Sequence, residues 1–151
     1  MLPNLHWIKG LDPVADAFAG TAVTDVVEAQ CEGVLFLVHK GVGATGTSTI
    51  TVLACDDTTP SNTTAVAFVY RTCTSGDTWG DWTRATTAGF TTTAGSSQMY
   101  QVYVESAELG SEGYGYVRLS AAEVVDSPVL GGIAIALVNP RYVEVGTSQT
   151  D

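Results

Sequence analysis

The sequence predicts an all-β fold, an antiparallel β-sandwich of jelly-roll-like architecture, and three observations lead to this prediction. Thr, Gly and Ser are abundant while only 15% of residues are charged, a composition that favours strands and tight turns over helices. Apolar residues alternate with period 2 in a series of short segments. Turn clusters such as DDTTPSN and SGDTWGD separate these segments at the spacing of an antiparallel sandwich. The pattern does not separate jelly-roll from immunoglobulin-like topology.

The predicted strands follow one another with no helix between them. A short strand is expected over residues 21–27, and the next three over 34–39, 47–55 and 65–71. Segments 34–39 and 65–71 are apolar on both faces, which is typical of a strand buried in the middle of a sandwich, whereas 47–55 alternates apolar residues with Thr as a half-buried strand does. The remaining strands are expected over residues 98–105, 114–120, 130–138 and 141–145.

The length of 151 residues fits one compact domain, and a hydrophobic content of 45% is sufficient for a core without metals or disulfides. We expect an irregular N-terminal arm over residues 1–20, a single β-sandwich domain over 21–145 and a polar C-terminal tail over 146–151. Because an arm of this kind contributes little to a core, deletion of residues 1–11 is expected to leave the domain folded.

The charge balance excludes two classes of partner. Six basic residues against sixteen acidic residues give a net charge of −10, and the basic residues are scattered singly. Binding to nucleic acid requires clustered Lys and Arg to neutralise phosphates, so neither nucleic acid nor an anionic membrane is an expected partner. The longest apolar run, over residues 129–138, is too short to span a bilayer, and the N-terminus lacks a signal-peptide pattern. We therefore expect the chain to fold in a cytoplasm.

Two loops have sequences that could bind a cofactor or a metal ion. Residues 41–46 spell GxGxxG after a predicted strand, but a dinucleotide site needs a helix at the third glycine, and the text that follows, TSTITVLAC, is a β-strand pattern. Asp56 and Asp57 offer oxygen ligands in one loop without the spacing of an EF-hand, which favours a solvated acidic turn over a calcium site. No cofactor and no metal site are predicted.

Three cysteines, Cys31, Cys55 and Cys73, cannot all pair internally because their number is odd. Reduced and mostly buried thiols are the favoured interpretation, with an intermolecular bridge or a Cys55–Cys73 pair as alternatives. The absence of a CxxC pair and of a His cluster argues against zinc.

The sequence gives little indication of catalysis. His6 and His39 are not near a GxSxG or HExxH pattern, and the acidic residues lie mostly in predicted turns, so we do not expect an enzyme. The most unusual stretch is SGDTWGDWT over residues 75–83, in which Trp79 and Trp82 lie close together. Tryptophans in such a loop can anchor a protein interface, cover the open end of the sandwich core, or stack on sugar rings.

Several stretches resemble a family of tailed-bacteriophage virion structural proteins. They are DPVADAFAGTAVTDVV, HKGVGATGTSTITVLACDD, AGFTTTAGSSQMYQVYVESAEL and SPVLGGIAIALVNPRY, and the resemblance runs from about residue 10 to residue 142. It implies a capsid decoration, or cement, protein on the outer surface of the head, assembled in the host cytoplasm. The implied partners are the major capsid protein and copies of the chain itself, with a trimer over threefold junctions. The family's pattern contains no catalytic residues to transfer.

The candidate contacts are exposed aromatic residues and isolated positive charges in an otherwise acidic chain: His6, Trp7, Lys9, Trp79, Trp82, Arg141 and Tyr142. Two other functions stay open from the sequence. One is a glycan-binding or host-attachment module of a head or tail fibre, for which the loop with Trp79 and Trp82 would have to lie open. The other is a structural subunit of the neck or tail.

Overall fold

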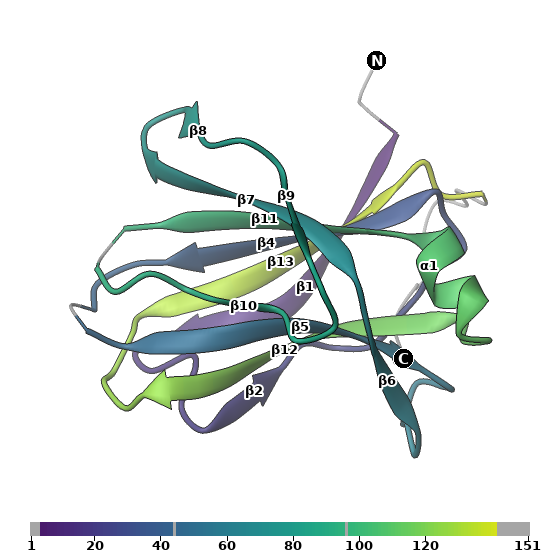
Figure 1. The fold of residues 1–151 in the computed structure, drawn as a ribbon, viewed down its shortest axis with the longest axis horizontal. Helices are drawn as coiled ribbons and strands as arrows, with labels where there is room; N and C mark the ends of the chain where they lie inside the picture. The colour runs from purple at the N-terminus through teal and green to yellow at the C-terminus, as the bar shows by residue number, and fades with distance from the viewer. Residues whose placement is uncertain (1–3, 44, 96, 142–151) are drawn as a thin grey trace.

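The chain forms a β-sandwich of two antiparallel sheets, as predicted (Figure 1). The computed structural model describes residues 4–43, 45–95 and 97–141. Sheet A has the strand order β1 (Leu5–Val14), β13 (Gly131–Val138), β4 (Gly33–Lys40), β11 (Met99–Glu105), β7 (Phe68–Ser75) and β8 (Thr78–Trp79), with β9 (Thr83–Ala85) also beside β7. Sheet B has the order β10 (Phe90–Thr91), β5 (Thr47–Cys55), β12 (Tyr116–Val125) and β2 (Thr21–Val23), with β3 (Val27–Glu28) beside β12 and β6 (Thr63–Val66) beside β5.

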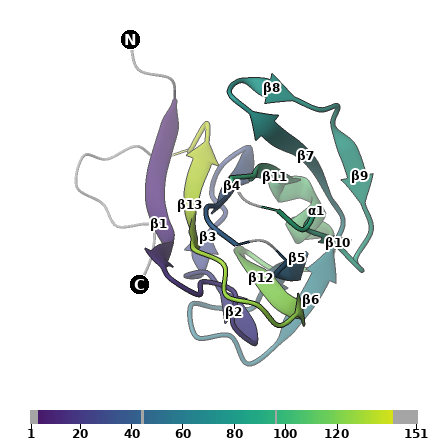
Figure 2. The same ribbon diagram turned by 90° about the vertical axis from the view of Figure 1, so that its left-hand side faces the viewer.

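The order of the strands is that of a jelly roll. The strands β1, β13, β4 and β11 of sheet A face the strands β2, β12, β5 and β10 of sheet B, and along the chain the backbone passes repeatedly from one sheet to the other. The first and last long strands, β1 and β13, pair with each other. This arrangement matches the double-sheet jelly-roll architecture. Figure 2 shows the two sheets facing each other, with β1 on one side and β9 on the other.

The segment from β7 to β9 is an addition to this framework. After β6 the chain leaves sheet B, enters sheet A as β7, turns back through β8 and β9, and returns to sheet B at β10 (Figure 2). The single strand predicted over residues 65–71 is therefore divided between the two sheets, with the break at Ala67. Apolar residues on both faces concealed this crossover, because the period-2 pattern continues through it unchanged.

The prediction of an irregular arm over residues 1–20 is wrong for Leu5–Val14, which form strand β1 along the edge of sheet A. Gly10 and Pro13 weaken the strand pattern in the sequence, and the register with β13 shifts on either side of Leu11. Gly10 is required there because a Cβ at this position would lie 2.8 Å from the Ile135 side chain. The predicted polar tail over 146–151 and the strand predicted over 141–145 lie outside the described residues, apart from Arg141, which is not in a strand.

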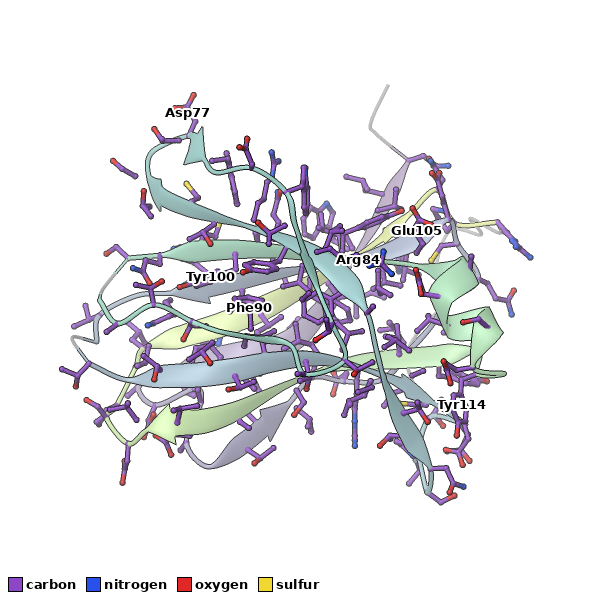
Figure 3. All side chains as sticks on the ribbon, in the orientation of Figure 1. Asp77, Arg84, Phe90, Tyr100, Glu105 and Tyr114 are labelled. Carbon is purple, nitrogen blue, oxygen red and sulfur yellow. The ribbon has the colours of Figure 1, made fainter. Side chains whose placement is uncertain are left out.

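The core lies between the sheets, where each strand turns alternate side chains inward. Phe36 and Ile135 of sheet A and Ile50 and Leu119 of sheet B are fully buried there. An aromatic cluster fills the side beneath β9 and β10: the Tyr70 and Phe90 rings stack with centroids 3.8 Å apart, and Phe68 and Tyr100 pack on Phe90. Figure 3 shows Phe90 and Tyr100 between the two sheets.

Two core features were not predicted from the sequence. The short helix α1 (Ser106–Ser111) closes the end of the sandwich opposite the β4–β5 turn and buries Leu109 (Figure 1). At the other end, the Lys40 side chain is almost fully buried and donates hydrogen bonds to the carbonyl oxygens of Gly46 and Thr93, at 3.0 and 2.8 Å. Burial lowers the pKa of this amine. Lys40 thus fastens the β4–β5 turn to the segment after β10.

A glycine pair provides a test of the packing between β9 and β10. Gly89 and Gly76 both have a positive φ, but a Cβ at Gly89 would lie 1.9 Å from the Ile50 carbonyl oxygen, whereas a Cβ at Gly76 would meet nothing within 4 Å. Substitution G89A is expected to lower the free energy of unfolding by about 3 kcal/mol, and the matched control G76A by about 1 kcal/mol. Urea denaturation measures both. Equal losses would contradict the described close approach.

Candidate functional site

The outward side of sheet A, called face A below, is apolar across its centre. The strand registers place side chains in rows that cross the sheet, and the longest row joins Trp7, Ala136, Leu35, Tyr103, Val69 and Arg84. The neighbouring row joins Lys9, Ala134, Leu37, Gln101 and Arg71. Leu35 and Leu37 on the central strand β4 are half-buried by their neighbours. An apolar stripe therefore runs across the sheet, with polar groups towards its sides.

The outward side of sheet B, called face B, has a different character. Its outward positions on β5 alternate with the core residues and carry Thr47, Thr49 and Thr51 before Leu53. Other strands of sheet B add further outward threonines, namely Thr21 on β2, Thr63 on β6 and Thr91 on β10. Threonines with this alternation are typical of the solvated face of an antiparallel sheet. Of the two faces, face A is the one whose composition suits a protein interface.

The β1 side of face A carries a shallow hollow of about 640 Å³. Trp7, Lys9, Leu37, His39, Leu130 and Ala134 contribute to its lining. The Trp7 side chain is 54% exposed, which is unusual for so large an apolar group. Lys9 forms an ion pair with Asp12 at 2.8 Å, and the hydrogen bond to Asp12 raises the pKa of the amine. The hollow thus presents an exposed indole beside a neutralised charge.

The other side of face A carries both remaining tryptophans. Trp79 pairs with Cys73 in the β7–β8 hairpin, whose tip carries Asp77 (Figure 3), and Trp82 lies just before β9. The Arg71 guanidinium lies over both indole rings, with its Cζ 4.8 Å from the Trp79 centroid and 4.7 Å from the Trp82 centroid. Trp82 is 47% exposed. The tryptophans therefore lie outside the core, and the interpretation that they cover the open end of the core is wrong.

The structure brings four of the predicted contact residues onto face A, namely Trp7, Lys9, Trp79 and Trp82. His6 is on β1 but alternates with Trp7 and Lys9, so it belongs to the opposite side of the strand. Arg141 follows β13 at the end of the sandwich, where its backbone N–H donates a hydrogen bond to the Gln30 carbonyl oxygen at 2.9 Å. Tyr142 lies outside the described residues.

Sequence reasoning missed the centre of face A. Leu35, Leu37 and Val69 were attributed to strands covered on both sides, because they make their segments apolar on both faces, and Tyr103 was not selected. In the structure these side chains are half-buried on the outward side of sheet A. The outward apolar side chains of these strands therefore indicated a surface available for contact, and this signal was present in the sequence.

The two loops weighed as cofactor or metal sites have local structural roles. The residues after Gly46 form strand β5, and no helix begins there. In the acidic loop, the Asp56 carboxylate accepts hydrogen bonds from the Ser61 hydroxyl and from the backbone and side-chain N–H groups of Asn62, at 2.9 to 3.1 Å. The side-chain hydrogen bond from Asn62 lowers the pKa of Asp56 to about 2. Within residues 4–43, 45–95 and 97–141, no group of three or more His, Cys, Asp or Glu side chains could hold a metal ion.

The three thiols are free and buried. Cys55 lies on β5 of sheet B and Cys73 on β7 of sheet A, both at outward positions, which places them on opposite sides of the sandwich and argues against a bond between them. Burial raises the pKa of Cys55 to about 11 and also raises that of Cys31. Buried thiols of this kind are inert rather than reactive.

The raised pKa of Cys55 predicts a loss of stability in alkali. A thiol whose folded-state pKa is about 11 stabilises the fold fully below its ordinary pKa of 9.0, and this contribution is lost as the pH rises towards 11. Urea unfolding at about pH 8 and about pH 10.5 should show a larger loss for the wild type than for C55A. The comparison isolates Cys55 from Cys31 and Tyr100, which titrate in both proteins. Identical losses in the two proteins would contradict this role of Cys55.

Comparison with protein-family models, curated proteins and solved structures found no match for this chain. Among the described residues, no helix is both long and apolar enough to cross a membrane. The sequence pattern and the two faces of the sandwich are therefore the features that bear on function.

Proposed function

We propose that this chain is a non-enzymatic decoration, or cement, protein of a tailed-bacteriophage capsid. It binds the outer surface of the head through face A and stabilises junctions between major capsid subunits. The observation that carries the proposal is the difference between the two faces, because one is apolar with exposed tryptophans towards its edges and the other is rich in threonine. The resemblance to virion structural proteins supports the choice of the capsid as the partner.

The distribution of the tryptophans fits a protein that bridges subunits. Trp7 lies on the edge strand β1, while Trp79 and Trp82 lie beyond β7, with β13, β4 and β11 between them. Tryptophan contributes more than its share of interface energy when it is buried on binding. Anchors at both sides of one face allow a single copy to contact two neighbouring subunits, and modest contacts at each then add through avidity.

Jelly rolls occur in capsid proteins and in lectins, so the fold alone does not decide between a capsid and a glycan as the partner. The placement of the tryptophans favours the capsid. A sugar-binding site needs an open aromatic face beside polar groups that fix the ring, but Trp79 and Trp82 each direct a ring face to Arg71. Beside Trp82 the hollow is lined by the apolar Leu35 and Val69, and the polar Arg71 and Gln101 there bond to each other.

Cosedimentation with capsids that lack this protein tests the proposal. The purified chain should bind with saturation near a whole-number ratio to the major capsid subunit. A panel of soluble glycans is added as competitor and should leave binding unchanged. Binding to a glycan without binding to capsids would contradict the proposal and indicate a role in host attachment. Binding only to isolated necks or tails would indicate a structural subunit of those parts.

A further inference from the structure

We propose that Arg71 is a recognition site for a carboxylate attached to an apolar group, supplied by an acidic side chain of the protein on which face A docks. The inference deepens the proposed function and depends on it only in taking face A as the docking surface. Arg71 would then make a specific polar contact on a face whose other contacts are mostly apolar.

The guanidinium of Arg71 is held in one orientation by three neighbours. Trp79 and Trp82 each approach it within 5 Å of a ring centroid, and its Nε donates a hydrogen bond to the Gln101 Oε1 at 2.7 Å. Each indole attracts the cation over its ring face, and the Gln101 bond occupies the Nε–H of the guanidinium. The N–H groups of the two terminal nitrogens lie at the remaining edges, in the plane where a carboxylate binds through two parallel hydrogen bonds.

Arg71 differs from the other cations of face A, Lys9 and Arg84, each of which forms an ion pair with a carboxylate. Lys9 pairs with Asp12 at 2.8 Å, and Arg84 pairs with Glu108 at 3.2 Å. In the described part of the chain, Arg71 forms no ion pair, and the partner of its side chain is the neutral amide of Gln101. A chain of net charge −10 has sixteen acidic residues with which to neutralise a cation. An unpaired Arg on the docking face is therefore matched to a negative group on the partner.

The surroundings of Arg71 define the kind of anion that fits. A hollow of about 530 Å³ lies beside it, lined by Leu35, Val69, Arg71, Trp82, Gln101 and Tyr103. The apolar walls suit the methylene groups of an aspartate or glutamate, or a hydrophobic neighbour on the same surface. A phosphate monoester carries about −1.5 to −2 charges near neutral pH, more than a carboxylate, so the net field of a strongly acidic protein favours a single carboxylate.

A small-molecule titration tests the site directly. Phenylacetate carries a carboxylate on an apolar ring, and phenylacetamide is its neutral counterpart. Phenylacetate should shift the NMR signals of the Arg71 Nε–H and of the Trp79 and Trp82 indole N–H groups with saturation at about millimolar concentration, while phenylacetamide should not. The shifts should vanish in R71M and persist in R84M, which removes the paired arginine. Equal shifts with both ligands, shifts that persist in R71M, or no saturable shift would overturn the proposal.

Capsid binding then separates this inference from the proposed function. We expect R71M to weaken binding to capsids by about 10-fold to 100-fold and R71K to weaken it less. Added salt should reduce the affinity of the wild type more than that of R71M. If the wild type binds phenylacetate as described but no capsid, the carboxylate site stands and the capsid proposal fails. If capsids bind the wild type and R71M equally, the carboxylate inference is overturned while the proposed function stands.

Discussion

Deletion of residues 1–11 is expected to destabilise the domain severely, because the deletion removes most of β1. Ile8 and Leu11 pack against the core from this strand, and their loss alone costs about 2–4 kcal/mol. The deletion also exposes β13, with the sequence GGIAIALV, as a new edge strand. Since a domain of this size has a total stability of about 5–15 kcal/mol, the thermal midpoint should fall by about 10 °C or more, with aggregation on heating.

Differential scanning calorimetry of the deletion variant measures this effect, and W7A is the matched control. Trp7 belongs to the same strand but points outward and is largely exposed, so its truncation should leave the midpoint close to that of the wild type. A deletion variant that melts at the wild-type temperature would show that residues 1–11 behave as the dispensable arm that the sequence indicated.

Substitution L37D is expected to abolish capsid binding while the domain stays folded. Leu37 lies at the centre of face A, on β4, between Ala134 and Gln101 on the neighbouring strands. On docking, a carboxylate at this position would lose its hydration and gain no hydrogen-bonding partner in return. This cost corresponds to a decrease in affinity of at least about 100-fold. Cosedimentation over a range of protein concentrations measures the affinity.

The matched control is T51D, which places the same charge at an outward position on the central strand β5 of sheet B. Both substitutions put Asp in the middle of a sheet, so their intrinsic cost to strand formation is similar. Capsid binding by T51D should equal that of the wild type. Equal losses for L37D and T51D would show that the docking surface is not face A, and binding by L37D at wild-type affinity would lead to the same conclusion.

The predicted fold class was correct because its signal is local and repeated. Alternation such as that of Ile50 and Val52 with Thr49 and Thr51 needs only the geometry of a strand to be interpreted. The β1 strand was missed since Gly10 and Pro13 interrupt its pattern, and its stability comes from pairing with β13, about 120 residues away in the sequence. The crossover at Ala67 was missed for a similar reason. When the chain passes from one sheet to the other, the alternation of inward and outward side chains continues, so the sequence pattern does not change.

Part of face A was predicted from the residue types. Residue type alone selected Trp7, Trp79 and Trp82, and the structure places all three on one face. Arg71 was not selected, because the meaning of a single arginine within a predicted strand depends on what lies across the sheet from it. Its neighbours come from two other segments of the chain, Gln101 from β11 and both tryptophans from residues 75–83, and the register of sheet A brings them together.

Electron cryomicroscopy of capsids decorated with the purified chain shows directly which face docks. We expect density for the sandwich on the outer surface of the head, with face A against the capsid, Trp7 and Trp82 buried in the contact, and the threonine-rich face B turned to solvent. Density with face B or the acidic loop at Asp56 against the capsid, or capsids that stay bare at saturating protein, would contradict it.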